Sequence, residues 1–589
     1  MTIHREISSI KALLAALYTF FLFCGEQYRR YGTIFGTLAR KPGIIPDTEK
    51  ERVLPWLEQQ YIRFCSWFDA QSPYGKWLRY LMIWLLLLLL ITALAALADR
   101  LIPTSGTSTG EKCEGQKKTA GLSFSLEWLL ILFAWAPFYL IRFPAGIDWD
   151  AYHQIAQAMG YEQMTSHWPP FVAWLMGGFV GFGLNVFHSV NTGVFLFSVF
   201  QACAIALILV RSLCFVRKYA SAAFEYGLLL LYMFSPLYAG YLTTVVKDGL
   251  FAAFTLLLLV YMAEFQTDLQ GQFKIGVTAL LVCLTRNNGS ILVGFAMLFS
   301  AVYYLRGRKK EYKCNAWRSL TIALLASLLV FKGYQTALTR LDIRPGSVKE
   351  SLSAPFQQTA RVLTVYPEDI TEQEKAQIDQ ALHVDELPVL YAPLLSDPVK
   401  DTYRESRKGL IPYFRAWITI GLRHPGVYLD ATIHNTYGFF DPLSRQLEHP
   451  YGLTTGALNA NENLQFTYPE QLAGAVTVLK KYTAFLEDFP ITGFFCNVQL
   501  QMWLAIALVL RTFARGYKKS ETKEKQPGKR SEEARRDTAA PGAGILAAMT
   551  AISLLILIDS PTWAYNGFRY TLPVILMNPV LLVTVRNRD

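Results

Sequence analysis

The sequence has few charged residues, and it lacks the patterns of a metal-binding or redox module. Charged residues make up 17% of the 589 residues, against about 25% in soluble domains, whereas hydrophobic residues make up 52% and the mean hydropathy is +0.24. The eight cysteines are scattered without a C-x-x-C pair, so neither a zinc site nor a redox motif is indicated. No small-residue cleavage site follows the first apolar run, and there is no solenoid or heptad period. These features favour a polytopic membrane protein.

The excess of positive charge fits the same class. The net charge is +11, and Lys and Arg gather in the cytoplasmic loops of membrane proteins. Nucleic acid is therefore not expected as a partner. The basic residues at 211–218, 306–310 and 515–536, together with Arg586 and Arg588, are predicted to face the cytoplasm.

Apolar runs near the length that crosses a bilayer set the predicted fold. We predict an all-α polytopic membrane protein with about 11–13 transmembrane helices and an extracytoplasmic α-rich domain inserted before the last three spans. The four predicted parts are N-terminal spans with a basic loop (1–123), a transmembrane core (124–335), the extracytoplasmic domain (336–490), and C-terminal spans with a cytoplasmic basic loop at 514–537 (491–589).

Two segments have more than one interpretation. Residues 171–187 must dip into the membrane and return, or end as a half-span, if the polar stretch before them is also to lie outside. Residues 410–440 are aromatic and amphipathic, so they either lie on the membrane surface or pack on the core of their own domain.

The polar stretch at residues 144–170 is the first candidate site. Polar groups between membrane spans are costly unless they lie at an interface or line a wet cavity. Asp148 and Asp150 could act as a general base or bind a metal or a sugar hydroxyl. Asp150 could instead cap the helix predicted to follow it. His167 precedes Pro169–Pro170, a rigid start to the next helix, and could also donate a hydrogen bond to phosphate.

Three later polar pairs have both a structural and a functional interpretation. Lys247–Asp248 is either a snorkelling lysine with its neighbour or an internal ion pair beside an anionic head group. Arg286–Asn287 is either a polar turn or an anion site. Arg569–Tyr570 matches the basic and aromatic belt of a membrane interface. All three pairs are predicted at the outer ends of spans, which is the layout expected for a lipid-phosphate substrate.

These residues resemble the GT-C superfamily of membrane glycosyltransferases, which use polyprenyl-phosphate-linked sugars. More closely, the chain resembles an uncharacterised, mostly Gram-positive bacterial membrane-protein family grouped with that superfamily. Trp168 stands where the superfamily more usually has His-His-Pro or His-Pro-Pro. The similar stretches, from about residue 124 onward, include APFQQTARV (354–362), YAPLLSDPVK (391–400), RHPGVYLDATIHNTYGFFDP (423–442) and NGFRYTLP (566–573).

The resemblance implies a GT-C-like fold in the plasma membrane, with the large domain outside the cell. It implies sugar transfer from a polyprenyl-phosphate donor to a cell-envelope glycan or protein, with Asp150 as general base and Asp148 as a second acid. The residues expected to bind substrate are His167, Lys247, Asp248, Arg286, Asn287, Arg569 and Tyr570.

Some of the chemistry stays open. The sequence demands no cofactor and no metal, which leaves a divalent metal ion open. The alternative functions are a transporter or flippase of lipid-linked glycans, a non-catalytic assembly protein, and a ligase or polymerase of glycans on the same lipid carrier.

Overall fold

The regular elements of this protein are helices. The computed structural model describes residues 2–34, 63–64, 67, 75–101, 122–265, 267–307, 311–441, 443–444, 464–522, 540–557 and 567–586. Within these ranges β-pairing is limited to isolated bridges, and no strand is formed. The predicted all-α class is therefore confirmed, while the GT-C-like arrangement and the number of spans stay predictions.

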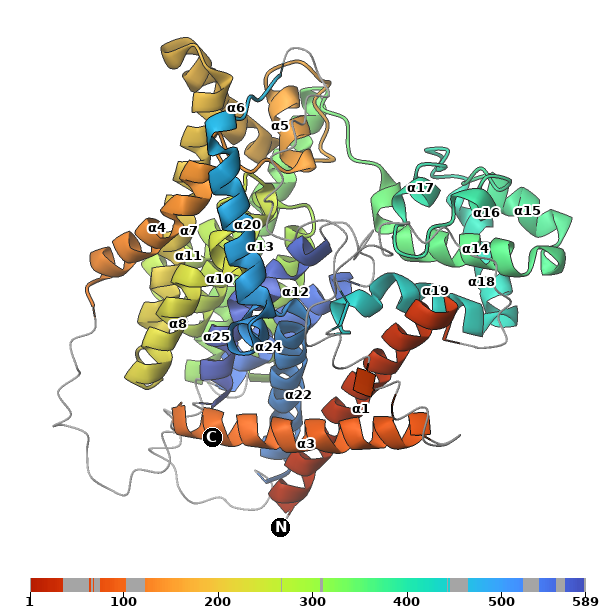
Figure 1. The fold of residues 1–589 in the computed structure, drawn as a ribbon, viewed down its shortest axis with the longest axis horizontal. Helices are drawn as coiled ribbons and strands as arrows, with labels where there is room; N and C mark the ends of the chain where they lie inside the picture. Colours follow the sequence, from red (N-terminus) through yellow and green to blue (C-terminus); the bar gives the residue numbers. More distant parts are fainter. Residues whose placement is uncertain are drawn as a thin grey trace.

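A helical bundle makes up most of the molecule (Figure 1). Its buried side chains form one continuous apolar core. The bundle contains α4 (Phe124–Ile141), α5 (Trp149–Ala158), α6 (Pro170–Phe187), α7 (Val190–Val216), α8 (Ala222–Phe234), α9 (Pro236–Ala239), α10 (Lys247–Ala263), α11 (Leu269–Thr285), α12 (Gly289–Gly307), α13 (Glu311–Arg340), α20 (Ala473–Asp488), α21 (Pro490–Cys496), α22 (Val498–Thr522), α24 (Ala540–Ile556), η7 (Gly567–Thr571) and α25 (Leu572–Arg586).

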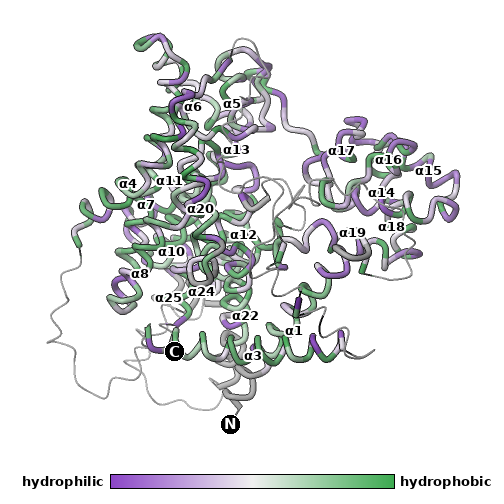
Figure 2. Tube along the Cα trace, viewed as in Figure 1, coloured by the Kyte–Doolittle hydropathy of each residue, from purple (hydrophilic) through white to green (hydrophobic). Residues whose placement is uncertain are grey.

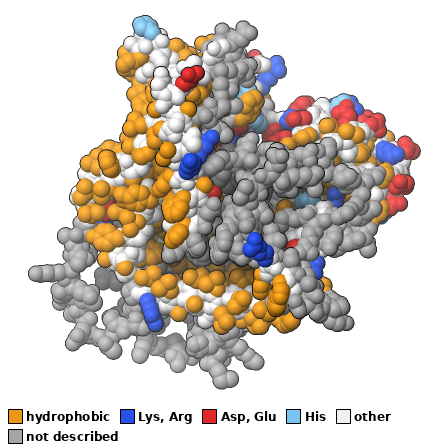
Figure 3. All heavy atoms as spheres, viewed as in Figure 1, with side chains coloured by type: hydrophobic (Ala, Val, Ile, Leu, Met, Phe, Trp, Pro, Cys, Tyr) orange, Lys and Arg blue, Asp and Glu red, His pale blue; other side chains and the backbone are white. Residues whose placement is uncertain are grey.

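Six helices in the described ranges are long and apolar enough to cross a membrane. Five shorter apolar helices accompany them. Two of the six, α1 (Thr2–Tyr31) and α3 (Gly75–Leu101), lie at one side of the bundle (Figure 1). In α3 none of the apolar window is buried inside the protein, and Figure 3 shows hydrophobic side chains over this part of the surface. A helix that is apolar all round needs an apolar environment, so these helices indicate a membrane-spanning protein.

Residues 171–187 form one continuous helix rather than a segment that dips and returns. Pro170 occupies the first turn of α6, where its missing N–H costs nothing. The 18 residues of α6 make it one of the candidate spans. A tight turn then leads into α7, and Gly183 and Gly193 let the two backbones touch, since a Cβ on Gly183 would lie 2.4 Å from the Gly193 nitrogen. A segment that dips and returns is therefore excluded, because an uninterrupted apolar run follows the Pro-Pro pair, and the alternative of a half-span stays a prediction.

A second, separate core lies beside the bundle. It is built by α14 (Ser353–Val365), α15 (Glu372–Asp379), α16 (Leu387–Leu390), α17 (Asp397–Lys400), α18 (Leu410–Arg423) and α19 (Pro425–Thr436). These helices are more hydrophilic than those of the bundle (Figure 2). They form the unit on the right in Figure 1, where α15 and α17 stand away from the bundle. We name this unit, residues 344–441, the side domain.

The amphipathic segment at 410–440 packs on its own core with one face. In α18 the side chains of Tyr413 and Ile420 are buried in the core of the side domain. Other apolar side chains of the same helix, such as Ile411 and Leu422, remain exposed. One face of α18 therefore packs on the core of its own domain, as one of the two interpretations proposed. The opposite face carries exposed apolar side chains.

The predicted domain at 336–490 contacts both cores. Its first part forms the side domain, whereas α20 packs on the bundle, where the Tyr482 hydroxyl donates to the Phe234 carbonyl (3.1 Å). The chain at 515–522, predicted as part of the cytoplasmic loop, continues α22, and residues 523–539 of that loop lie outside the described residues.

Candidate functional site

The backbone that carries Asp148 pairs with the backbone just before Lys247. The Val245 N–H donates to the Gly146 carbonyl (2.8 Å), and the Asp148 N–H donates to the Val245 carbonyl (3.3 Å). These bonds belong to a short parallel bridge between the segments that follow α4 and precede α10. The bridge places an acidic segment beside a basic one, although about a hundred residues separate them in the chain.

Arg142 stabilises the segment on one side of this bridge. Its guanidinium donates to the Gly240 carbonyl (3.0 Å) and the Thr244 hydroxyl (3.0 Å), and the side chain is almost fully buried. A buried guanidinium is stabilised only when its donors are satisfied. Arg142 was not among the predicted site residues, and it fixes the chain that positions Lys247.

Asp148 and Asp150 have different local roles. The helix α5 begins at Trp149, and the Asp148 carboxylate accepts from the Asp150 N–H (3.1 Å) as its N-cap. The interpretation of Asp150 as the cap is therefore wrong by two residues. Because the Asp148 carboxylate accepts the hydrogen bond from the N–H at the start of α5, the Asp150 side chain is available to interact with other charged groups.

Two cations converge on Asp150. Lys247, the first residue of α10, pairs with the Asp150 carboxylate, and the Arg569 Nη1 lies 2.9 Å from Asp150 Oδ2 and 3.2 Å from Asp148 Oδ1. These partners stand 97 and 419 positions from Asp150 in the chain. Lys247 is buried in this pair, so its interpretation as a snorkelling lysine is wrong.

Asp248 extends the network to a third cation. Its carboxylate, 1% exposed, lies 2.7 Å from Arg286 Nη1 and 3.9 Å from Arg569 Nη1. Tyr570 lies under both guanidinium groups, with its ring centre 4.6 Å from Arg286 and 5.2 Å from Arg569. Such contacts hold a guanidinium in place. We name the charge cluster by its six charged members, which are Asp148, Asp150, Lys247, Asp248, Arg286 and Arg569.

Burial and the neighbouring cations shift the pKa values of the two acids outside the candidate spans in opposite directions. Burial alone would raise the pKa of Asp150, but the charges of Arg569 and Lys247 outweigh it and hold that pKa well below the usual range. Burial raises the pKa of Asp148, and the charge of Arg569 offsets only part of this effect. Asp150 is therefore an ionised carboxylate.

The remaining predicted residues lie at the edge of the cluster. The Asn287 amide donates to the carbonyls of Ser166 (3.1 Å) and His167 (3.2 Å), so it ties the end of α11 to the segment before α6. The His167 ring lies 4.0 Å from Glu350 rather than in the cluster. Burial lowers the pKa of His167, and the nearby Glu350 charge opposes this effect. Asn287 therefore holds two segments of the chain together, and the His167 ring lies close to Glu350.

Trp168 is a neighbour of the cluster that the sequence did not indicate. A side-chain hydrogen bond from Trp168 to Asp150 helps to hold the pKa of that carboxyl low. The residue that interrupts the superfamily's His-Pro pattern thus favours the charged form of the predicted general base. No spacing rule links positions 150 and 168, so only the fold could reveal this contact.

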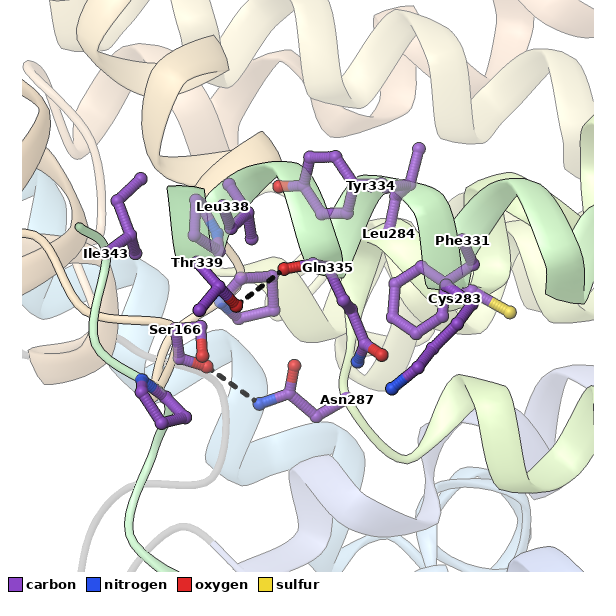
Figure 4. Close-up of a pocket in the computed structure, with 14 residues that line it drawn as sticks. Ser166, Cys283, Leu284, Asn287, Phe331, Tyr334, Gln335, Leu338, Thr339 and Ile343 are labelled. Carbon is purple, nitrogen blue, oxygen red and sulfur yellow. Dashed lines mark hydrogen bonds between the residues drawn. The ribbon is translucent and has the colours of Figure 1, made fainter. Parts of the chain in front are cut away.

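A cavity lies on the far side of Asn287, between α6, α11 and α13. Its volume is ≈ 230 Å³. Figure 4 shows Phe331, Gln335 and Leu338 of α13 on one side and Ser166 and Asn287 on the other. The cavity is lined by Ser166, Pro169, Pro170, Cys283, Leu284, Asn287, Phe331, Lys332, Tyr334, Gln335, Leu338, Thr339, Ile343 and Pro345. A space with both polar and apolar walls suits a molecule that carries a polar group on an apolar chain.

Metal ligation is not apparent in the described part of the chain. No group of three or more His, Cys, Asp or Glu side chains is placed there to hold a metal ion. The carboxylates of the charge cluster contact Lys and Arg instead.

Comparison with known proteins gives one match. A family model described as a family of unknown function (DUF6020) matches residues 161–520, more than half of the chain. The matched region includes Lys247, Asp248 and Arg286 and leaves out Asp150 and Arg569. No curated protein and no solved structure matches the chain.

Proposed function

The chain belongs to the DUF6020 family of unknown function, and from its charge cluster we propose a membrane glycosyltransferase with a GT-C-like fold. The enzyme would transfer a sugar from a polyprenyl-phosphate donor to an acceptor in the cell envelope. The observation that carries this proposal is the convergence of Lys247 and Arg569 on the Asp150 carboxylate. Preorganised cations beside a carboxylate supply both a phosphate site and a base.

Donor binding would exchange the partners of the cations. Without substrate, the cations Lys247, Arg286 and Arg569 are each paired with a carboxylate of the cluster. A lipid phosphate would take the place of the carboxylates on these cations, and Arg569 suits this exchange because its planar guanidinium binds two oxygens at once. The cost of separating the ion pairs is offset by new pairs of the same kind.

The same exchange would activate Asp150. Its pKa is held low by Arg569 and Lys247, and a carboxylate with a low pKa is a weak base. Phosphate neutralises those charges, so the pKa of Asp150 rises when the donor is bound. The base would therefore gain strength only in the presence of its substrate.

The chemical step follows from these roles. Asp150 takes the proton of the acceptor hydroxyl as the acceptor oxygen forms its bond to the anomeric carbon. The bond between that carbon and the phosphate oxygen breaks, and its electron pair leaves with the lipid phosphate. Lys247 and Arg569 stabilise the charge that develops there. The step needs no oxidant or reductant.

The charge distribution supports a site at the outer face of the membrane. The charge cluster lies near the C-terminal end of α4, through Asp148, and at the N-terminal end of α10, through Lys247. At the other end of the same helices, Glu127 and Glu264 pair with basic residues that follow α7. Basic residues favour the cytoplasmic side, so the charge cluster would lie on the opposite side.

The cavity beside Asn287 supports a lipid substrate. Asn287, which lines the cavity, directly follows Arg286 of the cluster in the chain. Phe331 and Leu338 offer apolar contacts to an isoprenoid chain. The side-chain amides of Asn287 and Gln335 can hydrogen-bond its polar end. The first isoprene units next to the phosphate would lie there.

Transport is the weaker alternative. A flippase needs charged groups deep in the bundle, at the level of the membrane midplane. The cluster instead lies at helix ends, since α5 and α10 begin there and α11 ends there. This placement favours transfer at one face.

The test separates binding from chemistry in Asp150→Asn. The purified protein in lipid nanodiscs is offered labelled polyprenyl-phosphate sugars, and both donor binding and sugar transfer are measured. We expect the variant to bind the donor at least as tightly as wild type, since two cations lose a competing carboxylate, and to lose transfer. Asp385→Asn, at an exposed position of the side domain, is the matched control. Transfer at the wild-type rate by Asp150→Asn would sink the mechanism.

A further inference from the structure

An aromatic surface adjoins the charge cluster on α5, where Trp149 stands between Asp148 and Asp150 and His153 follows Asp150 by about one turn. The rings of His153 and Trp168 stack with their centres 5.0 Å apart at an angle of 4°. Trp149 stands edge-on to His153, with ring centres 4.6 Å apart at 73°. We name these three rings the aromatic platform. Trp149 is 53% exposed, which is unusual for so large an apolar side chain beside a charged site.

Polar groups border the platform. The Glu162 carboxylate lies 2.8 Å from His153 Nδ1, and both side chains are partly exposed. Within the described part of the chain, the second ring nitrogen of His153 has no hydrogen-bond partner. When Nδ1–H donates to the carboxylate, Nε2 of a neutral ring is left as an acceptor. The platform thus combines an aromatic face with hydrogen-bonding groups at its edge.

The platform is continuous with the charge cluster through α5. Trp149 stands between Asp148 and Asp150, and His153, which stacks on Trp168, lies about one turn after Asp150 on the same helix. A molecule whose anionic group lies on Lys247 and Arg569 would therefore have its next atoms near these rings. Asp150 would stand between the anionic group and the group on the platform.

We propose that the aromatic platform binds the sugar ring of the lipid-linked donor. The C–H groups on one face of a pyranose carry partial positive charge and suit the negative face of an aromatic ring. The hydroxyl groups around the ring suit Glu162 and the free nitrogen of His153. This inference rests on the proposed function, because the phosphate on the cations sets the position of the sugar.

The other occupant of such a surface is the membrane itself. Exposed tryptophans are common at the level of lipid head groups, where they bind no substrate. A measurement can distinguish a bound sugar from the membrane. If the platform binds the sugar, a lipid phosphate that carries a sugar binds more tightly than the same lipid phosphate without one. The test therefore compares lipid phosphates with and without a sugar.

Binding is measured with the full chain in nanodiscs. The probes are polyprenyl phosphate alone and polyprenyl phosphates carrying glucose, galactose, mannose or N-acetylglucosamine. We expect at least one sugar-carrying lipid to bind more tightly than the bare phosphate, by about three- to tenfold for one aromatic contact. In Trp149→Ala this gain should vanish while binding of the bare phosphate is unchanged, and Trp149→Phe should keep most of it.

Controls separate the failure of this inference from that of the function. Trp174→Ala removes another exposed tryptophan, on α6, and should leave the gain intact. A gain that survives Trp149→Ala would overturn the platform and leave the proposed function standing, and a lipid interface would then explain Trp149. Failure of every lipid phosphate to bind would overturn both.

Discussion

At the scale of the residue, Arg569 has the largest number of partners in the charge cluster. Its Nη1 lies within 4 Å of Asp148, Asp150 and Asp248, and its guanidinium stands over Tyr570. A planar guanidinium can serve several acceptors at fixed angles, whereas an ammonium cannot. The site therefore depends on the shape of this side chain as well as on its charge.

Arg569→Lys tests this dependence on shape. The variant keeps the charge and loses one charged hydrogen bond, which is worth about 1.5–3 kcal/mol, or about 10- to 100-fold in donor affinity. Affinity for the lipid-phosphate donor is the measurement, with the exposed Arg318→Lys as control. Equal affinity in wild type and Arg569→Lys would mean that the phosphate does not reach Arg569.

A second residue-scale prediction concerns pH. Burial and the charge of Arg361 hold the pKa of His434 well below its ordinary value. The unfolded chain binds a proton at this residue below pH of about 6.5 and the folded protein does not, so stability falls as pH drops through that value. The loss is up to about 1.4 kcal/mol for each pH unit.

His434→Phe isolates this contribution. The substitution keeps an aromatic ring against Tyr28, on which His434 stacks at 4.0 Å, and removes the titration. Thermal unfolding is measured between pH of about 7.5 and about 5.5. We expect the melting temperature of wild type to fall further than that of the variant, and parallel curves would contradict the assignment.

At the scale of the element, α1 is attached to the side domain by one buried carboxylate. Asp430, in α19, accepts from the Tyr28 hydroxyl (3.2 Å) and the Ile34 N–H (3.1 Å) at the end of α1. It also pairs with Arg361 of α14 (2.8 Å). A small apolar core from Cys24, Tyr28, Ile433 and Tyr437 surrounds the contact. The candidate span α1 and the side domain are thus coupled at this point.

Asp430→Ala should weaken that coupling strongly. It leaves Arg361, 9% exposed, without its carboxylate, and breaking a buried pair in this way costs about 3–5 kcal/mol. Asp401→Ala is the control, because Asp401 is 70% exposed in its pair with Lys349 and such pairs contribute about 0–1 kcal/mol. Thermal unfolding in nanodiscs measures both variants. Similar melting temperatures for the two would contradict the coupling.

At the scale of the whole molecule, we propose that the side domain and the basic helix ends lie on opposite sides of a membrane. The supporting features are the charge asymmetry of the bundle and the more hydrophilic residues in the helices of the side domain (Figure 2). Single cysteines at Glu372 and Lys218, whose side chains are 88% and 52% exposed, test this in a cysteine-free background. A membrane-impermeant thiol reagent should label Glu372→Cys from outside and Lys218→Cys only after lysis. Labelling of both from one side would refute the orientation.

Much of the helix pattern could be predicted from the sequence. Apolar runs identified α4, α7 and α13, because a helix in a membrane must be apolar over most of its length. For residues 171–187 the sequence left a returning dip or a half-span open, and the apolar run that starts at Pro170 forms one continuous helix.

The sequence could predict which residues belong to the candidate site. It could not predict which of them form ion pairs with each other. Polar residues in apolar surroundings drew attention to Asp150, Lys247 and Arg569. Sequence neighbours suggested that Lys247 pairs with Asp248, whereas Lys247 pairs with Asp150 across a backbone bridge. Trp168 was missed for the same reason, because its contact depends on the return of the chain after α5.

The most direct test of the central claim is release of sugar from the lipid carrier. Purified wild-type protein in nanodiscs is incubated with radiolabelled polyprenyl-phosphate sugars and a cell-envelope acceptor fraction, with and without a metal chelator, beside Asp150→Asn. The account predicts that label leaves the lipid in wild type only and that the lipid product is polyprenyl phosphate. Label that stays on the lipid in wild type, although the lipid binds and Arg286→Ala weakens that binding, would contradict glycosyl transfer and favour a protein that binds or moves the lipid without chemistry.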